Sequence, residues 1–371
     1  MLGRRERFKF VISDCHLSAG AFFEGKLNPH EEFFFDDEMA DLIEYYSSGA
    51  YGGRTEVELV IAGDFFDYLN VPYQGRFDSE TTEEVALYKT EAMIRAHPKV
   101  MAALRKFASE PNKHITYLIG NHDAELFFDR VKERITREWD PAGHYPSAHV
   151  TLVSDRTYLK YPEGVEIHHG NQEEAANELD FEHPFLENSA GRKVLKLPWG
   201  SIYVLKVINR LKMERKHIDK IRPIKAFVFF GLFLDPFFTV KYLFVSSYYF
   251  LKTKIQEVLH FSGGIRKGVA QVRQELQLFQ TLEEEARAIL DAREEVKTVI
   301  FGHTHRPMNQ IWPDGKQYIN TGTWTKMINL DWSGWGQDFR RTYALIRIRD
   351  DHAECELRQW VGERGPSRVF R

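Results

Sequence analysis

Five short polar clusters contain the side chains of this sequence that are best suited to catalysis or metal binding. In chain order they are SDCH from Ser13, GDFFD from Gly63, GNHD from Gly120, HHGN from His168 and GHTH from Gly302. A D-x-H triplet such as Asp14 with His16 arises by chance about once in a chain of this length, so alone it indicates little. Five clusters in order, each directly after an apolar run, indicate a single functional site.

The clusters supply a set of metal-binding donors. The candidate ligands are Asp14, His16, Asp64, Asn121, His169, His303 and His305. This set offers imidazole and oxygen donors without a thiolate, which suits Mn²⁺, Fe or Zn²⁺ rather than a sulfur-bound structural zinc. Seven ligands are too many for one ion and fit two ions if one carboxylate bridges them. Asp64 is the expected bridge, because it follows a glycine that lets the backbone turn sharply.

Short apolar runs that alternate with helical patterns predict an α/β sandwich. The strands expected before the five clusters are Phe8–Ser13, Glu58–Ala62, Ile115–Ile119, Val165–His168 and Thr298–Phe301. The expected helices are Thr81–Ser109, Ala124–Trp139 and Arg266–Glu295, and the later strands are Gln317–Asn320, Tyr343–Ile348 and Glu354–Gln359. Because ligands collect beyond the carboxyl ends of strands in open α/β sheets, the clusters can converge on one site.

In this order the clusters resemble the motifs of the calcineurin-like metallophosphoesterase superfamily: D-x-H, G-D-x-x-D, G-N-H-D/E, H and G-H-x-H. The resemblance implies a four-layer αββα sandwich that carries a helical insertion. It implies a first metal ion held by Asp14, His16, Asp64 and His305. It implies a second metal ion held by Asp64, Asn121, His169 and His303. The family places glycine directly after the fourth-motif ligand, which favours His169 over His168.

The resemblance also implies a hydrolytic mechanism. Two divalent ions, with Mn²⁺ expected and Fe or Zn²⁺ as alternatives, would supply a bridging hydroxide that attacks a phosphoester or pyrophosphate in line. His122 matches the family histidine beside the leaving-group oxygen, where it can donate a proton. Asp123 is expected to orient that imidazole and to raise its pKa. Asp67 is a candidate for a carboxylate that contacts the metal ligands without binding a metal ion itself.

Charge is distributed unevenly along the chain. The 371 residues carry a formal net charge of −4 and are 43% hydrophobic, which excludes a disordered or disulfide-stapled chain. From Arg192 to Lys254 there are 14 Lys or Arg and 3 Asp or Glu, a net of +11, so the remainder carries −15. The same stretch contains two apolar runs rich in Phe and Tyr, Ala226–Leu234 and Phe237–Leu251.

This aromatic and basic stretch separates the fourth and fifth clusters and is interpreted as an insertion in a divided core. The expected parts are a first core segment at 1–185, a helical cap at 186–265 and a second core segment at 266–371. Asp235, Pro236 and Lys241 interrupt the apolar runs, so two short helices are expected rather than a transmembrane span. Two interpretations stay open: a cap that docks on an anionic membrane surface, or a buried hairpin with a solvated basic face. The basic residues expected to suit the membrane are Lys206, Arg210, Lys212, Arg215, Lys216, Lys220, Arg222 and Lys225.

The substrate is inferred from the cap and from a narrower resemblance. GHTHRP and the later NTGTW at Asn320–Trp324 resemble the UDP-2,3-diacylglucosamine pyrophosphohydrolase group, whose own insertion holds acyl chains. The chain departs from that group at His122, where Arg is typical, and at Asn171, where Asp is typical. A phosphoester site under a Phe-rich, basic cap suits a phosphorylated lipid or nucleotide-lipid. The alternatives are a nuclease or cyclic-nucleotide phosphodiesterase with the same site, and a non-catalytic scaffold.

The N-terminal segment and the cap predict where the protein is located and what it binds. The first apolar run is too short for a signal peptide, so a cytoplasmic protein with reduced Cys15 and Cys355 is expected. The cap would hold it peripherally at the inner face of the membrane. Contiguous Phe runs disfavour stable nucleic-acid binding. The oligomeric state stays open, and so does the role of segment 19–55, which either covers the site or packs on the core.

Overall fold

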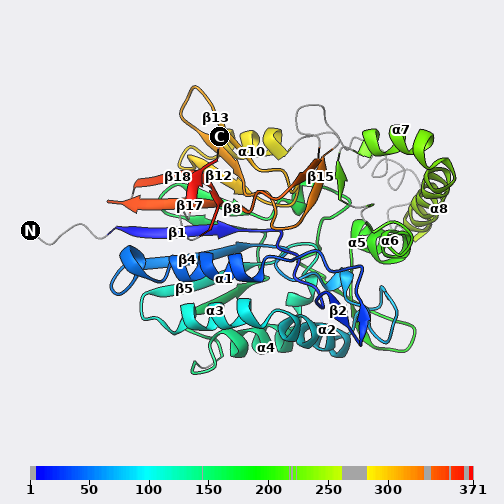
Figure 1. Cartoon of the computed structure of the whole chain (residues 1–371), viewed down its shortest axis with the longest axis horizontal. Coiled ribbons are helices and arrows are strands. Elements are labelled where there is room, and N and C mark those ends of the chain that lie inside the picture. Colours follow the sequence, from blue (N-terminus) through cyan, green and yellow to red (C-terminus); the bar gives the residue numbers. More distant parts are fainter. Residues whose placement is uncertain are drawn as a thin grey trace, which may run out of the picture.

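Two β-sheets lie face to face between layers of helices (Figure 1). The computed structural model describes residues 6–370 except 144, 217, 219, 223, 261–281, 330–335, 351 and 363–366. Strand β1 (Arg7–Ile12) points toward the end of the molecule where the helices of the cap lie (Figure 1). The carboxyl end of this strand, where the first polar cluster begins, therefore faces the cap.

The larger sheet has seven strands in the order β19-β18-β17-β1-β4-β5-β6. Its parallel part comprises β1, β4 (Glu56–Ala62), β5 (Lys113–Leu118) and β6 (Val150–Val153). Its antiparallel part comprises β17 (Thr342–Arg349), β18 (His352–Trp360) and β19 (Ser367–Val369). Side chains alternate between the two faces, so Phe10 and Ile12 pack in the core beneath the helices while Val11 packs in the core between the sheets.

The smaller sheet has five strands in the order β13-β14-β12-β8-β7. They are β7 (Tyr158–Tyr161), β8 (Val165–His168), β12 (Thr298–Phe301), β13 (Met308–Ile311) and β14 (Gln317–Asn320). Every residue of β8, β12 and β14 is buried, which is typical of strands covered on both faces. Val60 of the larger sheet and Ile167 and Ile300 of the smaller one share the apolar core between the sheets.

Helices form the two outer layers of the sandwich (Figure 1). Those on the larger sheet are α1 (Asp36–Tyr45), α2 (Glu83–Ala96), α3 (Pro98–Ser109) and α4 (Asp129–Trp139). Helix α10 (Leu282–Ala292) lies on the smaller sheet, where Leu290 shares a core with Val299 and Phe301. The predicted four-layer αββα arrangement is therefore confirmed.

The local predictions differ in their success. All eight predicted strands are present, with ends within two residues of those expected. The single helix predicted over Thr81–Ser109 is wrong: it breaks at His97, because the following Pro98 lacks the amide hydrogen a continuing helix needs. The helix predicted over Ala124–Trp139 begins as a 3-10 turn, η3 (Ala124–Phe127), before α4. Residues 266–281 of the predicted helix 266–295 lie outside the described residues, and α10 follows them.

The helices in the described part of the cap lie at one end of the molecule (Figure 1). They are α5 (Trp199–Tyr203), η5 (Val204–Ile208), α6 (Asn209–Lys212), α7 (Ile224–Leu234) and α8 (Pro236–His260). The break between α7 and α8 falls at Asp235, as predicted. Phe238 of α8 packs with Val207 and Leu211 in a small apolar core of its own.

The opposite face of the α7–α8 hairpin is not buried. Phe233, Phe237 and Phe244 are 74%, 90% and 72% exposed, so the interpretation of a buried hairpin is wrong for the described residues. None of the helices in the described part of the chain is both long enough and apolar enough to cross a membrane. Basic residues are also placed differently than expected, because Lys212 and Lys220 are buried.

Segment 19–55 packs on the core. Phe33 and Phe35 are buried in the main apolar core, while Phe22 remains 75% exposed. Oxygens of the Glu31 carboxylate accept hydrogen bonds from the backbone amides of Gly20 and Phe33, which fixes the loop. The remaining short elements are β2 (Phe22–Phe23), β3 (Lys26–Leu27), η1 (Gly49–Tyr51), η2 (Tyr68–Asn70), η4 (Asn171–Glu173), β9 (Phe185–Glu187), β10 (Lys193–Leu195), β11 (Ile221–Arg222), β15 (Met327–Asn329) and β16 (Gly336–Asp338).

Candidate metal centre

The backbone is strained where the predicted ligands lie. Nine non-glycine residues of the described chain have a positive φ, and five of them are predicted ligands: Asp14, His16, Asp64, His303 and His305. A left-handed backbone is unfavourable for residues with a Cβ and persists only where surrounding structure enforces it. Five left-handed residues in these loops indicate that the fold holds the ligand side chains in place at a cost in backbone energy.

Glycines of the clusters make room for the ligands. A Cβ atom at Gly120 would collide with the Asp64 carboxylate, and one at Gly63 would collide with the His169 ring. At Gly302 it would collide with the side chains of Ser13 and Asp14. The glycine in each of the GD, GN and GH motifs is thus required by a ligand that comes from a different strand.

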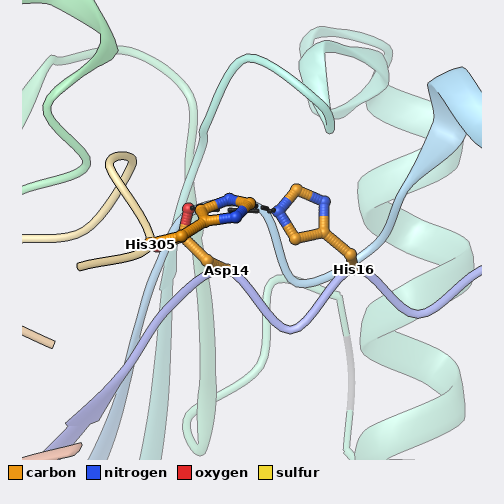
Figure 2. Close-up of side chains that lie close together, drawn as sticks. All are labelled: Asp14, His16 and His305. Atoms are coloured by element: carbon orange, nitrogen blue, oxygen red, sulfur yellow. Dashed lines mark hydrogen bonds and ion pairs between the residues drawn. The ribbon is translucent and has the colours of Figure 1, made fainter. Parts of the chain in front are cut away.

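The first group of ligands comprises Asp14, His16 and His305, whose side chains point toward one another (Figure 2). The Nε2 atoms of the two histidines lie 3.0 Å apart, and Oδ1 of Asp14 lies 3.3 Å from Nε2 of His305. Two atoms that bind one ion at about 2.1 Å lie about 3 Å apart when they make a right angle. The spacing therefore fits atoms that share an ion.

The second group comprises Asp64, His169 and His303. Nε2 of His169 lies 3.2 Å from Oδ2 of Asp64 and 3.2 Å from Oδ1 of Asn121. The other nitrogen of this ring, Nδ1, contacts the Ala62 carbonyl oxygen at 2.8 Å, so it carries the proton and donates. Nε2 is therefore the nitrogen that faces Asp64 and Asn121, and once it has lost its proton it provides the lone pair that a metal ligand requires.

Asp64 belongs to the second group and also lies near a ligand of the first. Its Oδ2 atom is 3.2 Å from Nε2 of His169 and 3.9 Å from Nε2 of His16. Its Oδ1 atom accepts a hydrogen bond from the His122 amide at 2.9 Å. Burial alone would raise the pKa of Asp64, but the neighbouring charges of His169 and His122 hold it below its usual range. This buried, ionised carboxylate is placed where a bridging ligand would lie.

The site as a whole fits two divalent cations. All seven predicted ligands come together from five separate segments of the chain: one group is Asp14, His16 and His305, and another is Asp64, His169 and His303 with Asn121 beside it. His16 also forms a third group, with Asp67 and His122. Asp14 and Asp64 are almost fully buried, and buried carboxylates are costly unless cations or hydrogen bonds compensate them. Imidazole and oxygen donors without a thiolate suit Mn²⁺, Fe or Zn²⁺.

His168 does not join the ligands. Its ring stacks on Tyr158 with centroids 5.0 Å apart and an interplanar angle of 16°. Its Nε2 atom lies 3.5 Å from the carboxylate of Glu166, which also pairs with Arg293. The structure thus brings His169 into the site and turns His168 toward the outer face of the smaller sheet.

The carboxylate that contacts His122 is Asp67, and the predicted pairing with Asp123 is wrong. Oδ1 of Asp67 lies 3.0 Å from Nδ1 of His122, and its Oδ2 lies 3.3 Å from Nδ1 of His16. Burial would lower the pKa of His122, but the charges of Asp67 and Asp64 outweigh it and raise that pKa to about 10. Asp67, which was predicted only to support the metal ligands, therefore also orients His122, the predicted proton donor.

Asp123 stabilises the loop instead. Its carboxylate accepts hydrogen bonds from the Phe65 amide at 3.1 Å, from the Tyr117 hydroxyl and from the Gly120 amide. Burial, followed by the charge of Asp64, raises the pKa of Asp123 to about 7. Asp123 therefore fixes the G-N-H-D turn that presents Asn121 and His122.

The cap reaches this network through residues that sequence analysis did not assign to the site. Asn70 donates from Nδ2 to Oδ2 of Asp67 at 2.6 Å, and its own Oδ1 lies 3.5 Å from Nζ of Lys212. Lys212 also forms a buried ion pair with Glu32. Short-range patterns could not reveal this contact, because Glu32 and Lys212 are 180 residues apart.

No family model matches the chain, and no curated protein matches it. Solved structures with a similar arrangement include a dimetal phosphatase from Danio rerio, with 12% identity over 94% of this chain and 98% of that one, and a TM-score of 0.37. A calcineurin-like phosphoesterase from Bacillus subtilis has 11% identity, coverage of 96% and 91%, and a TM-score of 0.35. A conserved uncharacterized protein from Streptococcus pneumoniae, described as a predicted phosphoesterase, has 10% identity, coverage of 98% and 97%, and a TM-score of 0.28. With identities and TM-scores this low, we draw no functional conclusion from these similarities.

Proposed function

We propose that this protein is a two-metal-dependent hydrolase of phosphoesters or pyrophosphates. The observation that carries the proposal is the convergence of the seven predicted ligands, with the Asp64 carboxylate 3.2 Å from His169 of one group and 3.9 Å from His16 of the other. Two bound divalent ions, which we propose to be Mn²⁺ with Fe or Zn²⁺ as alternatives, would lower the pKa of a water nucleophile and neutralise the phosphoryl oxygens.

Side chains of the chain itself supply the proton and its positioning. His122 is partly exposed at the site, with a raised pKa that keeps its imidazole protonated near neutral pH. A protonated imidazole can donate to the oxygen of the leaving group as the phosphorus–oxygen bond breaks. Asp67 holds the ring through Nδ1, which leaves Nε2 to face the substrate.

We further propose a lipid-linked phosphate as substrate, of the phosphorylated lipid or nucleotide-lipid class. An open groove of about 440 Å³ is lined by Trp199, Tyr203, Ser246, Ser247 and Leu251. Helix α5 connects this groove to the candidate site, because Trp199 and Tyr203 line the groove and Ser201 of the same helix donates to the Asn121 carbonyl at 3.2 Å. A mostly apolar groove connected in this way to a phosphoester site suits an amphiphile with an anionic head.

The α7–α8 hairpin is proposed to dock peripherally on an anionic membrane, at its inner face if the protein is cytoplasmic. Its exposed aromatic side chains provide an apolar face, and Arg210 and Lys216 lie exposed near it in the sequence. Basic side chains contribute less positive charge to this surface than the sequence predicts. Arg215 pairs with Asp235 at 2.6 Å, and Lys241 pairs with Glu214, so their charges are partly compensated.

The proposal is tested by identifying which bond of which substrate the protein hydrolyses. Purified protein would be incubated with Mn²⁺ and a panel of aryl phosphodiesters, nucleotide-linked lipids and single-stranded DNA, and the products identified by mass spectrometry. Asp64→Ala and His303→Ala should abolish turnover of every substrate, and wild-type turnover by either variant would contradict the two-metal proposal. Cleavage of DNA in preference to the lipids would replace the lipid substrate with the nuclease alternative.

A further inference from the structure

One carboxylate outside the seven predicted ligands contacts a ligand directly. Glu174 follows η4 and lies five residues after His169 in the sequence. Its Oε2 atom is 2.6 Å from Nε2 of His303, and Nδ2 of Asn177 donates to the same oxygen at 2.8 Å. The five polar clusters do not include Glu174, and its role in the site follows only from this contact.

The contact shows which nitrogen of His303 faces the carboxylate. Within the described part of the chain, the groups of potential metal ligands include His303 but not Glu174. Glu174 therefore contacts His303 without belonging to the group that His303 forms with Asp64 and His169. An imidazole that directs Nε2 to a carboxylate has Nδ1 left for a metal ion.

We infer that Glu174 is a positioning residue of the metal centre, which holds His303 through Nε2 and leaves Nδ1 to bind the second metal ion. This inference rests on the proposed two-metal function. A carboxylate on the outer nitrogen fixes the tautomer of a ligating histidine and makes it a stronger ligand. Glu174 would accept a hydrogen bond from the Nε2–H group, and the lone pair would then lie on Nδ1.

His303 is held at its backbone as well. Its amide donates to both oxygens of Asp14, at 3.1 and 2.9 Å, and its φ of 68° is left-handed. The backbone contact joins His303 to a ligand of the first metal ion, and the ring contact joins it to Glu174. With both ends fixed, the ring has little freedom to swing away from the second ion.

The loop that carries Glu174 is itself fixed against the cap. Asn177 donates to Glu174, and a Cβ atom at Gly200 of α5 would collide with the Asn177 side chain. The Gly200 amide also donates to the Ala176 carbonyl at 2.7 Å. The cap thereby supports the residue that positions a ligand of the second metal ion.

The test is a calorimetric titration of metal-free protein with Mn²⁺, with Glu174→Gln as the variant. Loss of the carboxylate charge should weaken one of two binding steps by roughly 10- to 100-fold and leave the other unchanged. The absorption spectrum of the Co²⁺-loaded variant should also change, since the ligand strength of one histidine changes. Asn177→Ala keeps the carboxylate but removes its support, and it should weaken the same step to a smaller extent.

Glu173→Gln serves as the matched control, because it removes a neighbouring charge from the same loop. It should bind Mn²⁺ as the wild type does. Two unchanged binding steps in Glu174→Gln, with a normal melting temperature, would overturn the inference, and so would tighter binding, which would make Glu174 a competitor of the metal. Wild-type protein that binds no Mn²⁺ would instead contradict the proposed function itself.

Discussion

Asp67 contacts two histidines of the candidate site with its two carboxylate oxygens. Oδ1 lies 3.0 Å from Nδ1 of His122, and Oδ2 lies 3.3 Å from Nδ1 of His16. One residue thus orients both the proposed proton donor and a proposed metal ligand. Because Asn70 connects Asp67 to Lys212, the position of the cap is linked to both histidines.

Removal of the proton donor should lower the rate without emptying the site. We expect His122→Ala to reduce kcat by roughly 10²- to 10⁴-fold, the usual contribution of general acid catalysis. Asp67→Asn should reduce kcat by at least about tenfold, since its neutral amide stabilises a protonated imidazole less. Steady-state kinetics would measure both, with metal analysis alongside. A His122→Ala protein that has lost its metal would show that His122 is a ligand.

Asp123→Asn should affect stability more than rate. The carboxylate accepts three hydrogen bonds in the interior, and an amide cannot accept all of them without presenting its NH₂ group to a donor. We expect the free energy of unfolding to fall by about 1–3 kcal/mol, as measured by chemical denaturation. A loss of kcat as large as that of His122→Ala, at unchanged stability, would restore the catalytic role first assigned to Asp123.

His97 should make the stability of the protein depend on pH. Burial would lower its pKa, but its contacts with Asp36 at 2.9 Å and with Glu31 raise that pKa to about 9. The unfolded chain has a histidine pKa of about 6.5, so the stabilisation is complete below that pH and is lost as the pH rises through 9. The free energy of unfolding lost in His97→Gln should therefore be larger at pH 6 than at pH 9.5, by up to roughly 3 kcal/mol. Equal losses at both pH values would show that His97 is neutral in the fold.

The α7–α8 hairpin should bind lipid vesicles through its exposed aromatic residues. Phe233→Ser with Phe237→Ser removes two of the most exposed rings, and each buried Phe contributes about 1.5–3 kcal/mol. Sedimentation with anionic vesicles should weaken at least about tenfold. Phe22→Ser is the matched control, because that ring is equally exposed but lies outside the hairpin. Unchanged sedimentation of the double variant would remove the membrane proposal, while hydrolysis of a soluble phosphodiester should continue in either case.

The sequence alone predicted the elements whose pattern is local. Short apolar runs identified β1, β4, β5 and β12, because such a run is visible within a few residues of sequence. The spacing and order of the polar clusters likewise predicted seven ligands that the fold brings together. Only Pro98, which divides α2 from α3, was a local signal that the helix prediction overlooked.

Tertiary structure alone decided which neighbours these residues have. Asp67 and Asp123 are both short acidic side chains near His122, and only the packed loops show that Asp67 holds the imidazole while Asp123 accepts hydrogen bonds from the loop behind it. Glu174 and Lys212 carried no motif, yet one contacts His303 and the other reaches Asn70. Such contacts join segments far apart in the chain, so they depend on how strands and helices pack, which no local pattern of residues encodes.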